Sequence, residues 1–456
     1  DEAELEVIQA HYAELGREPT DIELETLAQT WSEHCAHKTF RAAIATDDGE
    51  DRAPLIEMLR ETTNAIDAQF VKSAFVGNAG IVGFEGSTTL ALKAETHNHP
   101  SAVEPFGGAN TGVGGVIRDV LGIGHRPIAI TDVLCFGLPE TRLEDVPDGA
   151  LHPLRIREGV IAGVADYGNK IGLPTVAGAI VYDPGYTTNP LVFAGCIGAA
   201  DDWEADRGPF PADRVILLGG RTGRDGIRGA TFSSLTMDAS TGEVAGASVQ
   251  IGDPIVEKLL VDVLADSADL YTAITDCGAG GLTSAVGEMA EGVGADIDLD
   301  RVPLKYAGLE PLEIWLSEGQ ERMVVAVNPA KLGELETRCR RHGVEMSDIG
   351  GFTGDGVLTV RSRGEIVLEM TTDFLHDGRP QRRLDATMPT PARGEYVGRE
   401  VPDVRDAMLR LLAHRNIASK FRTIHRYDHE ILGATAVRPL VGQLSDAPAD
   451  GVVISD

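Results

Sequence analysis

The segment 92–100, LKAETHNHP, constrains the fold more than any other part of the chain. It follows a run, 87–92, whose threonines favour a β-strand. Side chains two residues apart on a strand share a face, about 6–7 Å from each other. If the strand continues, Lys93, Glu95 and His97 point to one side. A cation, a carboxylate and an imidazole at a strand end suit a magnesium-bound polyphosphate better than a packed core.

Alternating strands and helices organise most of the chain. Apolar runs predict strands at 75–82, 88–95, 128–136, 191–199, 215–218 and 323–327. Helical spacing predicts helices at 2–15, 156–168, 254–264 and 404–412, and Thr20 and Glu23 have the spacing of a capping box. The glycines of 107–115 predict a loop, and those of 275–282 predict a turn before a helix. The pattern predicts the α/β (α+β) fold class.

Changes in composition divide the chain into four parts. Residues 1–40 are expected to form a helical N-terminal arm, and residues 41–205 and 206–372 two α/β domains. Residues 373–456 are expected to begin as a polar linker, within the Pro-rich stretch 371–400. The stretch 427–432 then echoes the acid-His pattern of 32–35, which predicts that a second copy of the first domain begins there and that the chain stops inside it.

Composition limits the partners and the compartment. A net charge of −31 argues against non-specific nucleic-acid binding, which needs a basic surface. With 71 acidic residues and 8 lysines, the chain suits an acidic, high-salt proteome, although an ordinary acidic cytosolic protein is the alternative. The five cysteines are scattered without a CxxC pair, which favours a reducing compartment. Without an apolar run of about 18 residues or a signal peptide, we expect a cytoplasmic protein and no membrane partner.

Three carboxylates lie beside glycine-rich stretches, where backbone N–H groups can face an anion. They are Glu95, Asp119 and Asp276, and Arg118 adds a fork suited to a phosphate. Any one of them alone would be interpreted as a solvated loop carboxylate. Taken together with Lys93, they favour a site for Mg²⁺ and a phosphorylated ligand.

The histidines allow several interpretations. His97 and His99 around Asn98 resemble an HNH nuclease signature, but neither a metal finger nor a basic DNA-binding face is visible. Zinc is disfavoured because no third soft ligand lies at the usual spacing. Beside a phosphate-metal strand, both histidines suit acid–base or substrate contacts. His34 alone would be a helix-terminal residue, and the segments 250–254 and 317–322 alone would be polar turns.

Five segments in order identify a family resemblance: WSEHCAHKTF (31–40), LKAETHNHPSAVEPFGGANTGVGGVIRD (92–119), VQIGDP (249–254), DCGAGGL (276–282) and SEGQERM (317–323). Together they closely resemble the large synthetase subunit of phosphoribosylformylglycinamidine synthase in its short, multi-subunit form. The resemblance covers nearly the whole chain. It implies N-terminal and C-terminal domains like those of aminoimidazole ribonucleotide synthetase, followed by the start of a second pseudo-repeat.

The resemblance implies a carbon–nitrogen ligase of de novo purine biosynthesis. Such an enzyme uses ATP, Mg²⁺ and ammonia to convert formylglycinamide ribonucleotide to formylglycinamidine ribonucleotide through an imidate phosphate. Glutamine supplies the ammonia through a separate glutaminase subunit, aided by a small accessory subunit. A chain that lacks most of the second copy is expected to be inactive alone.

The resemblance also assigns roles to residues of this chain. His34 and His97 are catalytic, His97 as proton acceptor, and His37 and Lys93 contact ATP. His37 stands where the family often has Tyr, and Gly319 where Ser is common, so only a backbone contact is expected at Gly319. The metal ligands are Glu95, Asp119 and Asp276, and the substrate contacts are Thr96, His97, Asn98, His99, Arg118, Gln250, Glu318, Gly319 and Gln320.

Two other functions stay open from the sequence. One is a different ATP-dependent enzyme of the same superfamily, such as a kinase acting on thiamine monophosphate or an enzyme acting on selenide. The other is a nucleotide-binding or scaffold protein without catalysis. Ammonium-dependent and formylglycinamide ribonucleotide-dependent ATP hydrolysis would separate these alternatives from the ligase.

Overall fold

The computed structural model describes residues 1–205, 208–234, 236–242, 246, 249–389, 398 and 403–455. The chain begins with three helices, α1 (Glu2–Leu15), α2 (Asp21–Thr30) and α3 (Glu33–Ala36). The capping box before α2 is confirmed, because Glu23 N donates to Thr20 Oγ1 over 3.2 Å and Thr20 N donates back to Glu23. Trp31 after α2 is buried and donates to the carbonyl of Leu375, so the arm is packed against the second sheet.

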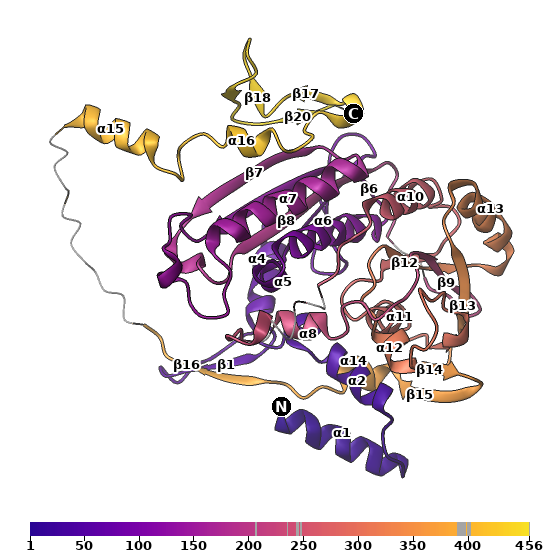
Figure 1. Cartoon of the computed structure of the whole chain (residues 1–456). Coiled ribbons are helices and arrows are strands. Elements are labelled where there is room, and N and C mark those ends of the chain that lie inside the picture. The colour runs from indigo at the N-terminus through magenta and orange to yellow at the C-terminus, as the bar shows by residue number, and fades with distance from the viewer. Residues whose placement is uncertain are drawn as a thin grey trace.

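The first sheet, as far as the described residues show it, has six strands in the order β3-β4-β5-β8-β6-β7. Helices α6 (Pro105–Leu121) and α7 (Pro153–Ile171) cover one of its faces, and α4 (Leu55–Ile66) lies nearby (Figure 1). On the other face Leu92 is 58% exposed, so the alternation along β5 is inward and outward as the strand prediction requires. The strands are β3 (Val71–Ser73), β4 (Gly80–Gly83), β5 (Thr89–Thr96), β6 (Arg126–Phe136), β7 (Thr175–Tyr182) and β8 (Leu191–Ala200).

The second sheet has seven strands within the described ranges, in the order β10-β12-β9-β13-β11-β14-β15. Alternate residues of its strand β9 enter two different cores: Ile216 and Leu218 pack with α6 and α10, and Val215 and Leu217 pack with the N-terminal arm. The strands are β9 (Arg214–Gly219), β10 (Ala273–Asp276), β11 (Ala295–Asp298), β12 (Arg322–Val327), β13 (Met346–Phe352), β14 (Val357–Ser362) and β15 (Glu365–Thr371). The helices are α8 (Gly229–Ser233), α10 (Pro254–Ala265), α11 (Leu282–Met289), α12 (Pro311–Leu316) and α13 (Leu332–His342).

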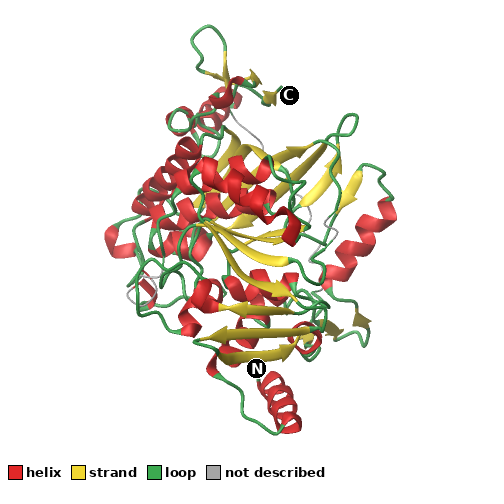
Figure 2. Cartoon of the chain, turned by 90° about the vertical axis from the view of Figure 1, so that its right-hand side faces the viewer, coloured by secondary structure: helices red, strands yellow, loops and turns green. Residues whose placement is uncertain are grey.

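The two sheets stand one above the other, with helices packed around them (Figure 2). The mixed α/β class expected from the sequence is therefore confirmed. None of the helices in the described ranges combines the length and the apolar character that crossing a membrane requires.

The structure corrects three local predictions. The glycine-rich stretch 107–115 is helical throughout, inside α6, rather than a loop. The stretch 371–400 is more than a linker, because it contains α14 (Thr372–Asp377) and β16 (Arg383–Ala386), and β16 pairs in parallel with β1 (Ala43–Thr46), itself paired with β2 (Asp51–Arg52). Residues 390–397, 399 and 400 of that stretch lie outside the described residues. The strand predicted at 75–82 begins only at Gly80.

The C-terminal part lies over the edge strand β7 (Figure 1). It contains α15 (Val404–Ala413), α16 (Phe421–Ile424) and four short strands among its described residues. Tyr427 of this part donates to Asp132 of β6 over 2.8 Å. The short strands are β17 (Thr435–Val437), β18 (Leu440–Val441), β19 (Ala447–Pro448) and β20 (Val453–Ile454). This part covers an edge whose backbone groups would otherwise be open to pairing.

Candidate functional site

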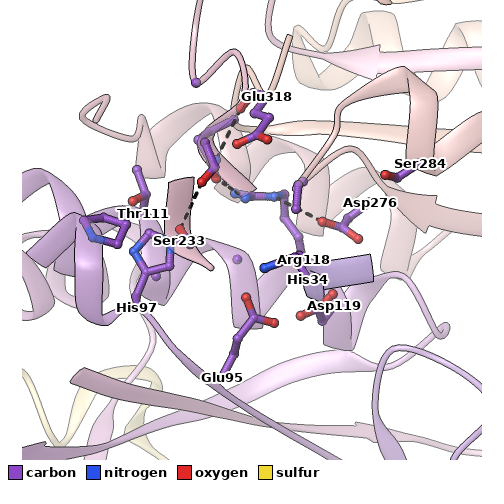
Figure 3. Close-up of a pocket in the computed structure, with 18 of the residues that line it drawn as sticks. His34, Glu95, His97, Thr111, Arg118, Asp119, Ser233, Asp276, Ser284 and Glu318 are labelled. Atoms are coloured by element: carbon purple, nitrogen blue, oxygen red, sulfur yellow. Dashed lines mark hydrogen bonds and ion pairs between the residues drawn. The ribbon is translucent and has the colours of Figure 1, made fainter. Parts of the chain in front are cut away.

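One cavity of about 670 Å³ brings together the arm and both α/β domains (Figure 3). Every residue predicted for the site lines it except Gly319. Those on the walls are His34, His37, Lys93, Glu95, Thr96, His97, Asn98, His99, Arg118, Asp119, Gln250, Asp276, Glu318 and Gln320. Gly319 lies behind the wall, where its N–H donates to Ser317 Oγ and its carbonyl accepts a bond of 2.7 Å from Arg322.

The end of β5 places a cation between two carboxylates. Lys93 Nζ lies 3.1 Å from Glu95 Oε2 and 3.0 Å from Asp119 Oδ2. Burial opposes the charge on Lys93, but Asp119 and Glu95 outweigh it and raise the pKa of the ammonium. Burial likewise opposes the charge on Glu95, yet Lys93 and His34 hold the pKa of that carboxyl below its ordinary value. This part of the wall therefore carries fixed charges of both signs.

His97 caps the start of α5 (Asn98–Val103), directly after β5. Its Nδ1 bonds to the backbone carbonyl of Gly108. A carbonyl oxygen can only accept, so we assign the proton to Nδ1, which leaves the lone pair on Nε2. Burial lowers the pKa of His97 and so favours the neutral ring. A neutral imidazole with a free lone pair can accept a proton.

The glycines of α6 explain how a helix can lie so close to this segment. A Cβ at Gly108 would lie 2.4 Å from the backbone of Pro100, and one at Gly112 would lie 2.8 Å from Cβ of His97. Glycine weakens a helix interior by about 1 kcal/mol relative to alanine. Here it permits the close approach that sets the position of the His97 ring.

Arg118 enters the cavity wall from α6 with its terminal nitrogens already bound. Nη1 donates to Glu257 over 2.7 Å, and Nη2 donates to the side-chain oxygen of Gln320. Nε lies 4.0 Å from Asp276 and has no hydrogen-bond partner among the described residues. Burial opposes the charge of Arg118, but Glu257 and the other acidic groups around it together outweigh burial and raise the pKa of the guanidinium.

Whether the cavity suits a divalent cation depends on its donors and its charge. Among the described residues, no three His, Cys, Asp or Glu side chains are already gathered as a metal site. The described lining nevertheless carries five carboxylates (Glu95, Asp119, Asp276, Glu288, Glu318) against the two cations Lys93 and Arg118. Burial is the main cause that raises the pKa of Asp119, and the nearby carboxylate of Asp276 raises it further. All of these donors are oxygens, which Mg²⁺ prefers, and an excess of buried negative charge favours a cation.

Several lining residues escaped the sequence prediction. Asn78 donates toward Asp276 over 3.4 Å, Ser233 lies at the end of α8, and Phe232 meets the ring of His99 edge-on at 5.9 Å. Glu288 of α11 also faces the cavity, and burial followed by Asp276 raises its pKa to about 7. The density of glycines between 219 and 229 was a signal for the α8 segment, whereas nothing in the sequence singled out Asn78 or Glu288.

Comparisons with known families agree with this geometry. Residues 76–200 match the AIR synthase related protein N-terminal domain and residues 211–363 its C-terminal domain. Residues 1–38 match the formylglycinamide ribonucleotide amidotransferase linker domain. The three matched ranges correspond to the first sheet, the second sheet and the helical arm.

Whole-chain comparisons identify relatives of greater length. The chain is 37% identical to phosphoribosylformylglycinamidine synthase subunit PurL of Thermoplasma acidophilum, over 99% of this chain and 58% of that relative. It is similar to T. maritima PurL complexed with FGAR, with a TM-score of 0.72, 33% identity and coverage of 95% of this chain and 64% of that one. T. maritima PurL complexed with ATP gives a TM-score of 0.69, 31% identity and coverage of 95% and 62%. The chain thus spans 58% of the length of the curated relative.

Proposed function

Because the chain belongs to the phosphoribosylformylglycinamidine synthase subunit PurL family, we propose that it is an ATP-dependent ligase of de novo purine biosynthesis. It converts formylglycinamide ribonucleotide and ammonia to formylglycinamidine ribonucleotide, ADP and phosphate. The observation that carries the proposal is the single cavity in which Lys93 and His97 face Arg118 and Asp119 of α6. The FGAR and ATP complexes of the T. maritima relative support it.

The chemistry follows from the substrate. An amide oxygen is a poor leaving group, so ATP first phosphorylates it to give an imidate phosphate. Phosphoryl transfer needs positioning and charge neutralisation more than covalent help, and Lys93 and Arg118 supply positive charge. Ammonia then attacks the imidate carbon and inorganic phosphate leaves. His97 Nε2 accepts a proton from the amide or from the attacking nitrogen.

The remaining wall residues hold the two substrates. His37 and Lys93 contact ATP, and His34 acts beside the reacting groups. The formylglycinamide ribonucleotide is held by Thr96, His97, Asn98, His99, Arg118, Gln250, Glu318 and Gln320. Gly319 lies behind this wall, and its bonded backbone supports the turn that carries Glu318 and Gln320. Exclusion of water by these walls protects the imidate phosphate from hydrolysis.

Magnesium is part of the same proposal. Glu95, Asp119 and Asp276 would hold it, because they supply oxygen ligands and the described lining has more acidic than basic groups. When bound, the ion neutralises phosphate charge.

The ammonia source and the partners belong to the proposal as well. We infer that glutamine supplies ammonia through a separate glutaminase subunit with a small accessory subunit. The name of the relative as a synthase subunit supports an assembly of several chains. A cytoplasmic location stays a prediction from the sequence.

A coupled assay of ADP release by the full-length protein tests the function. We expect ATP hydrolysis that requires both formylglycinamide ribonucleotide and an ammonium salt. Turnover with thiamine monophosphate or selenide instead would assign the protein to another reaction of the superfamily. A folded protein that binds Mg–ATP in calorimetry without turnover would favour the nucleotide-binding alternative.

A further inference from the structure

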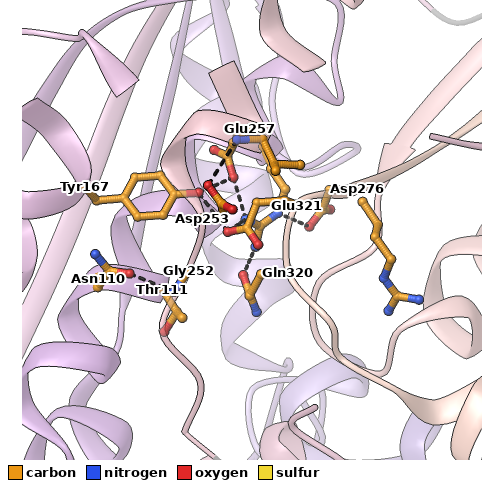
Figure 4. A network of polar contacts seen from close by, with 12 residues as sticks. Asn110, Thr111, Tyr167, Gly252, Asp253, Glu257, Asp276, Gln320 and Glu321 are labelled. Carbon is orange, nitrogen blue, oxygen red and sulfur yellow. Dashed lines mark hydrogen bonds and ion pairs between the residues drawn. The ribbon is translucent and has the colours of Figure 1, made fainter. Parts of the chain in front are cut away.

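A buried polar network contains Tyr167, Glu257 and Glu321 (Figure 4) and binds Arg118, which lines the cavity. Arg118 Nη1 and the Tyr167 hydroxyl lie 2.7 Å and 2.6 Å from the same oxygen, Oε2 of Glu257. The hydroxyl is also 3.0 Å from Glu321 Oε1, so its single proton can serve either carboxylate. Glu257 of α10 and Tyr167 of α7 lie outside the described lining of the cavity.

The backbone at two glycines packs closely against the side chains of the network. A Cβ at Gly114 would lie 2.6 Å from the Tyr167 hydroxyl and 3.1 Å from Arg118 Nη1. A Cβ at Gly252 would lie 2.6 Å from the Tyr167 ring, and Gly252 N donates to Asn110 over 2.8 Å. Glycine at both positions therefore lets α6 and the loop before α10 close on the tyrosine.

Stability alone is a weak reason for such an arrangement. Arg118 is 1% exposed and Glu257 is fully buried, and removing two charges from water can offset or exceed their attraction. Apolar side chains of similar size would join the two domains at least as well. The ion pair instead fixes the orientation of the guanidinium. Nη1 binds Glu257, which lies outside the described lining of the cavity, and Nη2 binds Gln320, which lines the cavity.

We propose that Glu257 and Tyr167 are positioning residues that hold the Arg118 guanidinium, and through it Gln320, toward the charge that develops during phosphoryl transfer. The proposal rests on the proposed ligase function. Glu257 and Tyr167 act through Arg118 and do not touch the substrate. The alternative is that the Tyr167–Glu257 contact only stabilises the packing of α7 against α10.

Kinetics of two conservative variants separate these alternatives. For Glu257→Gln and Tyr167→Phe we expect kcat to fall about 10- to 100-fold, as for other outer-shell partners, with KM for ATP changed less than about 3-fold. Tyr427→Phe is the matched control, because it also removes a buried tyrosine hydroxyl bonded to a carboxylate, and neither Tyr427 nor Asp132 belongs to the described lining of the cavity. It should lower the melting temperature and leave kcat unchanged. Variants of Glu257 and Tyr167 that behave like this control would overturn the proposal.

A measurement on Arg118 itself does not depend on turnover. In ¹⁵N NMR of the full-length protein, the Nε–H signal of Arg118 is assigned by its loss in Arg118→Lys. We expect its hydrogen exchange to become at least about tenfold faster in Glu257→Gln and Tyr167→Phe, and to stay unchanged in Tyr427→Phe. If hydrogen exchange at Arg118 is unchanged in both Glu257→Gln and Tyr167→Phe, the positioning role is rejected. Faster exchange in a protein without ligase turnover would show that Glu257 and Tyr167 hold Arg118, and would reject the proposed function rather than this contact.

Discussion

Tyr167 and Tyr427 each bond to a buried carboxylate, but in very different surroundings. Tyr167 meets Glu257 behind the cavity, where Arg118 binds the same carboxylate. Tyr427 meets Asp132 under the C-terminal part, where Asp132 makes no ion pair with any described residue. Burial raises the pKa of both carboxyls to about 7. Glu257 thus also binds a cation at the cavity, whereas Asp132 lies on β6 beside the edge strand β7. We call the Tyr427–Asp132 pair the edge contact.

We expect the Tyr167–Glu257 contact to support catalysis through Arg118. The Tyr427–Asp132 contact should instead hold the C-terminal part against the first sheet, which is the docking side of the comparison. Changes around the cavity should alter turnover and ligand binding while the protein stays folded. Changes at the edge contact should alter stability, and its dependence on pH, while turnover stays the same. Each prediction below tests one side of this comparison.

The largest effect is expected at His97. His97→Ala removes the proton acceptor, so kcat should fall about 10²- to 10⁴-fold in the ADP-release assay. The melting temperature should stay near that of the unchanged protein. Asp132→Asn is the control from the edge contact and should keep kcat within about 2-fold. Near-normal turnover by His97→Ala would remove His97 from the mechanism.

The second-largest effect is expected when divalent cations are removed, which should weaken the binding of ATP. The described lining has five carboxylates and two cations, and ATP brings further negative charge. One unbalanced charge at 4 Å is worth about 4 kcal/mol near a protein surface, so Kd for ATP should rise at least about 100-fold in chelator. Calorimetry with and without Mg²⁺ measures this change. Equal affinity in both conditions would contradict the metal assignment of Glu95, Asp119 and Asp276.

The edge contact should make stability depend on pH. The pKa of Asp132 rises from 3.8 to about 7 on folding, so between these values the folded state keeps a proton that the unfolded state has lost. The free energy of unfolding should therefore decrease with rising pH, by about 1.4 kcal/mol per unit within that window, and level off above it. Asp132→Asn cannot titrate. Urea unfolding at pH 5 and pH 8 should show a smaller decrease for Asp132→Asn, and identical decreases would exclude Asp132 as the source.

The regular elements could be predicted because their patterns are local. The strands predicted at 128–136 and 191–199 are observed at Arg126–Phe136 and Leu191–Ala200, and the helix at 254–264 is observed at Pro254–Ala265. The helical state of 107–115 could not be predicted, because propensity penalises glycine in a helix. The reason for those glycines is the approach of Gly112 to His97, which only the folded chain reveals.

The site was predictable only where motifs carry it. Lys93 and Glu95 share a face of β5, and His97, one residue past the end of the strand, lines the same cavity, as the spacing in the sequence indicated. Glu257 and Tyr167 look like ordinary positions of amphipathic helices, so nothing marked them as partners of Arg118. The pairing of β1 with β16 was equally hidden, since it joins Ala43 to Arg383 across most of the chain.

The smallest effect is expected at Asn416, which binds the edge strand β7. Its side chain accepts from Tyr182 N over 2.8 Å and donates to the carbonyl of Tyr182 over 3.2 Å, as a neighbouring strand would. Asn416→Ala should lower stability by about 1 kcal/mol, the net worth of such bonds near the surface. Asn64→Ala, at an exposed position of α4, is the control and should change stability by less than about 0.5 kcal/mol. Faster hydrogen exchange at Tyr182 N in Asn416→Ala, with unchanged kcat, would place this contact firmly on the docking side of the comparison. Loss of turnover would instead show that the C-terminal part and the cavity are coupled.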